Sequence, residues 1–247
     1  MRSDEYLAMY NLEERFWWYR GMRSVTASIL ERYLDRKGTP PRILDVGCGT
    51  GYSLSWLGRL YRTDHTYGID VSQHAADIWN SRDLHTAAIA SASDLPFESN
   101  QFDLVTCFDV VYQFSPDRSR RALSEIHRVL KPGGLVFIRE PAYDWMRGSH
   151  DLAVATVHRY TRRELKASLA SLGFSLLRTT YCNSLLFWAA VPHRLVSRIS
   201  GKDTSDVRPV SKSLDRAFGF ALDLEAKFVR RFAFPFGLSV VAIARRQ

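Results

Sequence analysis

Residues 42–51 constrain the fold of this chain more than any other stretch, and they read Arg-Ile-Leu-Asp-Val-Gly-Cys-Gly-Thr-Gly. An apolar run begins after a Pro-Pro pair, reaches Asp45 and then enters three alternate glycines. This pattern predicts a buried parallel strand that ends in a tight turn and opens a helix. Because glycine has no side chain, a ligand can approach the backbone closely at such a turn. In open α/β sheets, nucleotides bind at turns of this kind.

The glycine spacing narrows the choice of ligand. The dinucleotide-binding fingerprint requires its third glycine at position 52, where this chain has Tyr52. No lysine follows the glycines, which argues against a phosphate-binding P-loop. The stretch therefore predicts a nucleoside ligand without indicating NAD.

The chain has 247 residues, of which 46% are hydrophobic. This length and composition fit one core domain with an insertion or a small cap. The net charge of +8 is uneven: residues 1–144 carry a balance of −2 and residues 145–247 a balance of +10. The basic part could face an acidic substrate, a membrane surface or nucleic acid, or it could be a solvated surface without a partner.

The three cysteines, Cys48, Cys107 and Cys182, are too few and too scattered for a disulfide framework or a zinc site. We expect them to be reduced packing residues of a cytoplasmic protein, with no metal bound. Acids at Asp4 and Glu5, without an apolar segment beside them, argue against a signal peptide. The apolar run at residues 185–191 is too short to span a bilayer.

Strand and helix patterns alternate along the chain, which indicates parallel strands covered by helices on both faces. After the opening strand, further strands are predicted at residues 66–70, 84–90, 102–108, 135–139, 174–181 and 238–244. Helices are predicted at residues 4–36, 52–60, after Ser72, at 117–130, from the capping box of Thr161 and Glu164 to 172, at 185–199 and at 214–232. The last helix is expected to present one apolar stripe, made of Leu214, Phe218, Leu222, Phe228 and Phe232.

Acidic residues follow two of these strands at positions that suit a nucleoside. Asp70 lies 19 positions after Gly51, where an acid reaches a ribose hydroxyl pair in nucleoside-binding α/β folds. Asp94 could accept a hydrogen bond from an adenine amino group while Leu95 packs on the ring. Near the N-terminus, the aromatic residues 16–19 precede Arg20 and Arg23. They either pack on the edge of the sheet or close over the cofactor as a lid.

Four blocks of sequence resemble the class I S-adenosylmethionine-dependent methyltransferases. They are residues 44–51, residues 68–70, residues 94–97 with 102–105, and residues 125–134 (Glu-Ile-His-Arg-Val-Leu-Lys-Pro-Gly-Gly), in the order and spacing of that family. The resemblance implies a Rossmann-like α/β three-layer sandwich whose seven-stranded sheet is parallel except for an antiparallel last strand. It divides the chain into an N-terminal helical lid (1–38), a cofactor-binding core (39–182), a helical cap insertion (183–236) and the final core strand (237–247).

The resemblance also implies S-adenosyl-L-methionine as the cofactor and S-adenosyl-L-homocysteine as its product. By analogy, Asp45 and the glycine loop hold the methionine end, Asp70 holds the ribose, and Asp94 with Leu95 holds the adenine. The residues expected to contact the cofactor are Asp45, Gly47, Cys48, Gly49, Gly51, Asp70, Val71, Ser93, Asp94, Leu95 and Phe108, with Trp18 and Arg23 from the N-terminal helix.

Residues 14–20 and 150–161 are similar to a large bacterial subgroup of methyltransferase-domain proteins. Many members of that subgroup have a histidine where this chain has Arg15, and some have another near Ala155. No catalytic role is therefore carried over from those two positions.

Methyl transfer is an in-line displacement, so much of the acceleration can come from holding the acceptor in line with the methyl group. A hydroxyl or ammonium acceptor also needs a base. The candidates are His150, Tyr112 and His158, with Asp151 or Glu140 as orienting residues. Each has a structural alternative: Tyr112 could wall a pocket, His150 and Asp151 could cap a helix, and His158 could pack locally. Catalysis by proximity alone is a further possibility.

The expected acceptor is an oxygen or nitrogen atom of a small molecule or peptide, which could be acidic. The reaction is expected to belong to specialised biosynthesis. The alternative acceptors are RNA and a lipid or isoprenoid at a membrane surface, which the protein would contact weakly. Alternatively, the protein is a module that binds the cofactor and catalyses no reaction. Residues 108–111 lack the Asn/Asp-Pro-Pro-aromatic block of enzymes that methylate base amino groups, so no stable nucleic-acid complex is expected. The protein is expected to be a monomer or a homodimer.

Overall fold

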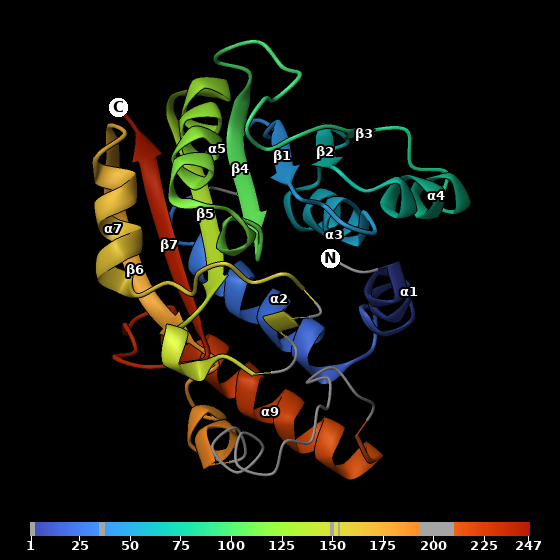
Figure 1. Cartoon of the computed structure of the whole chain (residues 1–247), viewed down its shortest axis with the longest axis vertical. Helices are drawn as coiled ribbons and strands as arrows, with labels where there is room; N and C mark the ends of the chain where they lie inside the picture. Colours follow the sequence, from blue (N-terminus) through green and yellow to red (C-terminus); the bar gives the residue numbers. More distant parts are fainter. Residues whose placement is uncertain (1–2, 35–37, 149–150, 153, 193–209) are drawn as a thin grey trace.

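A computed structural model describes residues 3–34, 38–148, 151–152, 154–192 and 210–247, and its centre is one seven-stranded sheet (Figure 1). The strand order is β3-β2-β1-β4-β5-β7-β6. All pairings are parallel except those of β7, which runs antiparallel to β5 and β6. The strands are β1 (Ile43–Val46), β2 (Thr66–Asp70), β3 (Ala87–Ile89), β4 (Phe102–Phe108), β5 (Leu130–Pro141), β6 (Phe174–Cys182) and β7 (Ser239–Arg246). The Rossmann-like sheet with an antiparallel last strand is confirmed.

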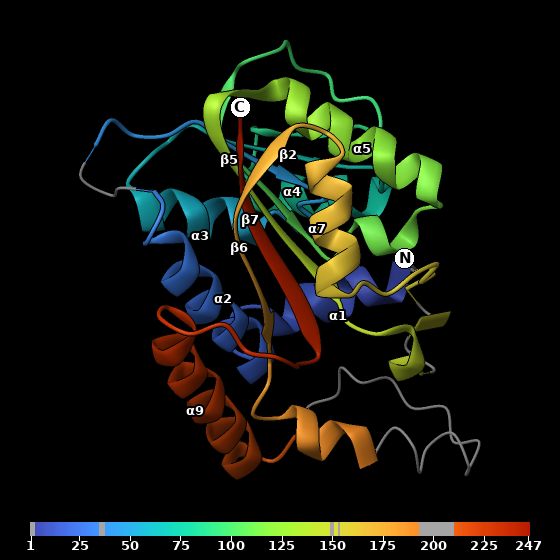
Figure 2. The same cartoon turned by 90° about the vertical axis from the view of Figure 1, so that its left-hand side faces the viewer.

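Helices cover both faces of the sheet, which gives three layers (Figure 2). The helices are α1 (Ser3–Leu12), α2 (Trp17–Leu30), α3 (Tyr52–Tyr61), α4 (Gln73–Ser81), α5 (Pro116–Val129), α7 (Arg162–Ala170) and α9 (Lys212–Val229), with short 3-10 turns η1 (Val111–Gln113) and η2 (Asp144–Met146). Helices α2, α3 and α9 lie on one face of the sheet, and α5 and α7 on the other.

The central strands are apolar on both sides because each side is buried against helices. Ile43, Leu104 and Phe137 point to the face that holds α2 and α9. Their neighbours Leu44, Val105 and Val136 point to the face that holds α5 and α7. This arrangement explains why β1, β4 and β5 appear in the sequence as continuous apolar runs rather than as alternating ones.

The predicted elements match the structure closely in the core. Strands β2 and β4 have the predicted bounds, and Thr161 and Glu164 form the predicted capping box at the start of α7. The N-terminal helix is divided, however, because the chain turns at residues 13–16 between α1 and α2. The predicted helix at 185–199 and the loop after it fall in part on residues 193–209, outside the described residues.

The predicted apolar stripe of the last helix is wrong in part. Leu222 is fully buried, but Leu214, Phe228 and Phe232 are 47%, 49% and 62% exposed. The buried face consists of Gly219, Leu222, Glu225, Ala226 and Val229. A glutamate can lie on this face because the Glu225 carboxylate accepts hydrogen bonds from the backbone N–H groups of residues 183–185, at 2.5, 2.7 and 3.2 Å.

Helix α9 packs against α2, which brings the N-terminal segment next to the insertion between β6 and β7 (Figure 1). The ring of Trp17 meets that of Phe218 edge-on at 5.1 Å, and the backbone N–H of Trp17 donates to Asp215 at 3.0 Å. The three cysteines are free and buried. No helix in the described part of the chain is long and apolar enough to cross a membrane.

One glycine of β2 lies where the core leaves no room for a side chain. A Cβ atom on Gly68 would meet Cys48 Sγ at 2.7 Å and Leu54 Cδ1 at 2.8 Å. We expect Gly68→Ala to lower the free energy of unfolding by about 1–3 kcal/mol, the usual effect of overpacking a core. Urea denaturation followed by tryptophan fluorescence measures the change. Gly38→Ala is the control, because a Cβ atom there meets nothing within 4 Å. Equal effects of the two substitutions would contradict the packing described.

Candidate active site

The loop after β1 has the left-handed backbone that its glycines permit. Gly47, Gly49 and Gly51 have φ values of 77°, 54° and 81°. The backbone N–H groups of Gly47 and Cys48 both donate to the carbonyl of Ile69 in β2, at 2.8 and 2.9 Å. Gly49 is also approached from α1, since a Cβ atom there would meet the Met9 methyl at 2.8 Å. The predicted turn therefore forms, and it lies against β2 and α1.

Asp70, at the end of β2, is joined to this loop by hydrogen bonds. Its carboxylate accepts from the backbone N–H of Gly49 at 3.0 Å and from that of Ser72 at 3.0 Å. It also accepts from the Tyr6 hydroxyl in α1 at 2.9 Å. The glycine loop and the acid that the sequence predicts for one nucleoside site are thus in direct contact. Val71, the next predicted contact, is 61% exposed.

Asp45 lies at the carboxyl end of β1 and is 1% exposed. It accepts hydrogen bonds from Ser53 Oγ at 2.5 Å and Thr106 Oγ1 at 2.6 Å. Burial raises the pKa of Asp45 to about 6, although these two hydroxyls and the charge of Arg139 favour the ionised form. Asp45 therefore changes charge close to neutral pH.

The segment predicted to hold adenine is fixed from α5. The backbone N–H of Leu95 donates to Glu125 Oε2 at 2.9 Å, and Arg128 donates to the carbonyl of Leu95 at 3.1 Å. The Leu95 side chain is buried, whereas Asp94 is exposed. Ser93 Oγ is buried and has no hydrogen-bond partner among the described residues. This segment therefore offers one buried hydroxyl and one exposed carboxylate to a ligand.

An arginine that the sequence analysis missed lies between two predicted cofactor contacts. Arg139 Nη2 in β5 is 2.5 Å from the carboxylate of Asp109. Its guanidinium lies 5.1 Å from the ring centroid of Trp18 and 5.0 Å from that of Phe108. In the sequence, the one indication of Arg139 is its place directly after an apolar run, which puts a charged residue at the end of a predicted strand. Its role as the ion-pair partner of Asp109 depends on the pairing of β4 with β5.

Arg23, predicted to contact the cofactor, binds the turn between α1 and α2. Its guanidinium donates to the carbonyls of Glu13 and Glu14 at 2.6 and 3.1 Å and lies 4.8 Å from the ring centroid of Tyr52. Arg23 thus lies beside the first turn of α3, with its hydrogen bonds directed to the N-terminal turn.

Tyr112 and Asp151 have structural partners in the loops after β4 and β5. The Tyr112 hydroxyl accepts from Gln113 Nε2 at 3.0 Å, and burial raises the pKa of Tyr112. Asp151 forms a two-pronged ion pair with Arg159, at 2.8 and 2.9 Å. Burial alone would raise the pKa of Asp151, but the Arg159 guanidinium holds it below its usual value. His150 lies outside the described residues, so its relation to Asp151 stays a prediction.

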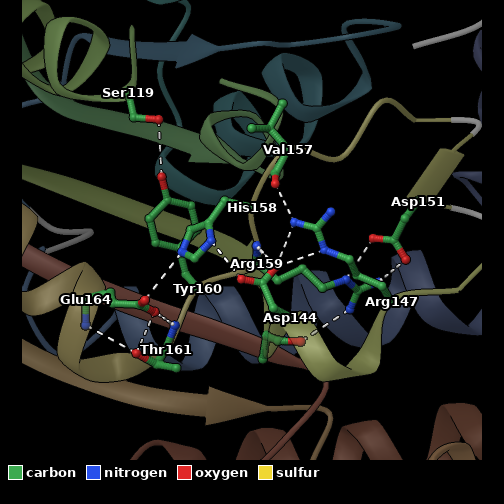
Figure 3. A network of polar contacts seen from close by, with 11 residues as sticks. Ser119, Asp144, Arg147, Asp151, Val157, His158, Arg159, Tyr160, Thr161 and Glu164 are labelled. Carbon is green, nitrogen blue, oxygen red and sulfur yellow. Dashed lines mark hydrogen bonds and ion pairs between the residues drawn. The ribbon is translucent and has the colours of Figure 1, made fainter. Parts of the chain in front are cut away.

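His158 lies between two carboxylates (Figure 3). Its Nδ1 is 2.9 Å from Asp144 in η2, and its Nε2 is 3.5 Å from Glu164 in α7. The backbone N–H of His158 donates to the carbonyl of Tyr112 at 2.9 Å, so these two candidates lie on touching segments. His158 therefore links the Tyr112 loop, η2 and the start of α7.

Glu140 positions the Tyr112 loop instead of orienting a histidine. Its fully buried carboxylate accepts hydrogen bonds from the backbone N–H groups of Val110, Val111 and Tyr112, at 3.4, 3.1 and 3.1 Å. Burial raises the pKa of Glu140 well above its usual value. Among the described residues, no group of three or more His, Cys, Asp or Glu side chains could hold a metal ion.

The sequence is similar to those of known methyltransferases. The chain is 30% identical to a malonyl-[acyl-carrier protein] O-methyltransferase of Coxiella burnetii, over 58% of this chain and 49% of that protein. It is 32% identical to the human probable tRNA methyltransferase 9B, over 44% of this chain and 23% of that protein. The chain thus spans about half the length of the first relative and less of the second.

A solved S-adenosylmethionine-dependent methyltransferase of Archaeoglobus fulgidus has the same fold. Its TM-score is 0.57 at 18% identity, over 91% of this chain and 94% of that one. Residues 44–138, which include the glycine loop, Asp70 and the segment around Ser93, match the methyltransferase domain family. Residues 44–138 are therefore a methyltransferase domain, and the sheet around them has the fold of the class I S-adenosylmethionine-dependent methyltransferases.

Proposed function

We propose that this protein transfers a methyl group from S-adenosyl-L-methionine to an oxygen or nitrogen atom of a small molecule or peptide. One observation carries the proposal. Two buried carboxylates, Asp45 and Asp70, stand at the ends of neighbouring strands, and a positive-φ glycine loop joins them. Such a pair suits a ligand with a cationic end and a ribose diol.

The residues present fit this cofactor. The Asp45 carboxylate complements the ammonium and sulfonium charges, and the Asp70 carboxylate is an acceptor for ribose hydroxyls. The unpartnered hydroxyl of Ser93 and the exposed carboxylate of Asp94 lie in one segment with the buried Leu95, which suits adenine. The further cofactor contacts that we propose rest on the resemblance in sequence: Gly47, Cys48, Gly49, Gly51, Val71, Phe108, Trp18 and Arg23. When bound, the cofactor supplies an electrophilic methyl group on a good leaving group.

The residues of the chain contribute mainly by positioning. Glu140 holds the Tyr112 loop through three backbone hydrogen bonds, and the buried pair of Arg159 and Asp151 holds the segment after η2. An acceptor bound between these loops would be kept in line with the methyl group, and such positioning can supply much of the acceleration.

A base is needed only where the acceptor must lose a proton. We propose His158 for this role, with Asp144 as the residue that fixes its ring, because its backbone is joined to Tyr112. Tyr112, with its raised pKa, is better suited to donate a hydrogen bond as a neutral phenol. Asp151 acts through Arg159, and His150 remains a candidate on sequence grounds.

RNA is the second candidate acceptor, favoured by the basic balance of residues 145–247 and the likeness to a probable tRNA methyltransferase. We place it second because residues 108–111 lack the block typical of base-amino methylation. We further propose that the protein is cytoplasmic, with weak contact to a membrane surface, and that it is a monomer or a homodimer. The four-part division of the chain given above is part of this proposal.

The cofactor site is tested by two carboxylate substitutions. We expect Asp45→Asn and Asp70→Ala each to reduce S-adenosylhomocysteine binding below detection in isothermal titration calorimetry, because one removes the carboxylate that faces the ammonium group and the other the acceptor of the ribose hydroxyls. Asp64→Asn, at an exposed position between α3 and β2, should bind as the wild type does. Unchanged affinity in both site variants would refute the assignment.

Asp45 also links pH, stability and binding. Its pKa of about 6 in the folded protein exceeds the usual 3.8, so folding favours the protonated form. This stabilisation is complete below pH 4 and is lost as pH rises through about 6. The shift of about two pH units corresponds to about 3 kcal/mol.

We therefore expect Asp45→Asn to be more stable than the wild type at pH 7.5, by up to about 3 kcal/mol in chemical denaturation. Ligand affinity should behave oppositely: S-adenosylhomocysteine should bind wild type more weakly as pH falls from 8 to 5, as Asp45 loses its charge. A wild-type affinity that does not change over this range, or a destabilised Asp45→Asn, would contradict the proposed role of Asp45.

The acceptor is identified by transferring a labelled methyl group into fractionated extracts, with mass spectrometry of the products. We expect the label in the small-molecule or peptide fraction, on a compound that gains one methylene in mass, and we expect His158→Gln to lower the rate without weakening cofactor binding. Label confined to RNA would establish the second candidate instead.

A further inference from the structure

The N-terminal helix α1 contacts the residues that the proposed function assigns to the cofactor. Its Tyr6 hydroxyl donates to Asp70 Oδ1 at 2.9 Å, and its Met9 methyl lies over Gly49. Tyr6 is 6% exposed and packs with Cys48, Leu54 and Trp79. Thus α1 covers the glycine loop and the end of β2 (Figure 1).

A count of the acceptor positions on Asp70 shows a conflict with a ribose. A carboxylate offers about four lone-pair positions, two on each oxygen. On Oδ1, the Ser72 N–H and the Tyr6 hydroxyl use both positions, and on Oδ2 the Gly49 N–H uses one. A ribose diol that donates one hydrogen bond to each oxygen would find room on Oδ2 and none on Oδ1.

The anchoring of α1 is separable from that of the turn that follows it. The Glu13 carboxylate accepts from Thr50 Oγ1 at 2.5 Å and from Arg82 Nη2 at 2.6 Å, and Arg23 donates to the Glu13 carbonyl. Helix α1 itself has 10 residues, fewer than the roughly 12–15 that an isolated helix needs in water. The position of α1 therefore depends on side-chain contacts such as those of Tyr6 and Met9, whereas the turn at residues 13–16 has contacts of its own.

We propose that Tyr6 and the cofactor ribose compete for the carboxylate of Asp70, so that α1 closes the cofactor site of the free protein and leaves Asp70 when the cofactor binds. This inference rests on the proposed role of Asp70 as the ribose acceptor. It makes Tyr6 a residue that lowers cofactor affinity, because the competent state is only a fraction of the free protein.

The test removes one hydroxyl and keeps the ring that packs on Cys48 and Trp79. We expect Tyr6→Phe to bind S-adenosylhomocysteine about tenfold more tightly than wild type in calorimetry, since the competing hydrogen bond is lost. Tyr10→Phe is the matched control, because Tyr10 lies on the same helix with its ring against Arg82, and its affinity should equal that of wild type. Equal or weaker binding by Tyr6→Phe overturns the competition.

Hydrogen exchange provides a readout that does not depend on affinity. We expect amides of residues 4–12 to exchange faster when wild type is saturated with S-adenosylhomocysteine, and faster in free Tyr6→Phe than in free wild type. Slower exchange on saturation would mean that α1 closes over the bound cofactor, and would overturn the proposal.

Asp70→Ala separates the two hypotheses. If wild type and Tyr6→Phe bind S-adenosylhomocysteine equally while Asp70→Ala does not bind it, the proposed competition by Tyr6 is refuted and the proposed cofactor site is supported. If neither wild type nor Tyr6→Phe binds, the proposed site fails and the competition with it.

Discussion

The carboxylate of Asp70 holds together the part of the molecule on which the rest of the site depends. It receives hydrogen bonds from the glycine loop after β1, from the start of α4 and from α1, three segments that are distant in sequence. The loop can approach this carboxylate because Gly49 adopts a positive φ that other residues rarely tolerate. The junction fixes the glycine loop against the end of β2, beside the end of β1.

Buried polar side chains play the same part in the loops after β4, β5 and β6. Glu140 and Glu225 each accept three backbone N–H groups and so fix the segments after β4 and β6. Arg159 and Asp151 neutralise each other with about 6% exposure apiece. Removing one partner of this ion pair leaves an unpaired buried charge, which is more destabilising than the intact pair is stabilising. These groups hold irregular loops in place where regular secondary structure cannot.

The core of the fold was predictable because local patterns determine it. Apolar runs that end in Asp45 and Asp70, and the capping box of Thr161, reflect backbone chemistry within a few residues. The buried face of α9 was predicted wrongly in part, because the expected stripe contained only apolar residues, whereas the structure buries Glu225 through long-range hydrogen bonds. The break between α1 and α2 likewise follows from contacts of Glu13 with Thr50 and Arg82.

The cofactor side of the site was more predictable than the acceptor side for a related reason. The glycine loop and the acids are tied to strand ends, whose positions follow from strand pairing. The ion pairs of Arg139 with Asp109 and of Arg159 with Asp151, and the contact of His158 with Asp144, join strand ends and loops, and no local period encodes such pairings. The hydrogen bond between Tyr6 and Asp70 spans 64 positions and could be found only in three dimensions.

The central claim is that one ligand bridges the carboxylates of Asp45 and Asp70 across the glycine loop. A crystal structure of the protein with S-adenosylhomocysteine tests it most directly. We expect ribose hydroxyls within hydrogen-bond distance of Asp70, the amino-acid end beside Asp45, and the Tyr6 hydroxyl moved away from Asp70. Ligand density at another edge of the sheet, or none at a saturating concentration, would contradict it.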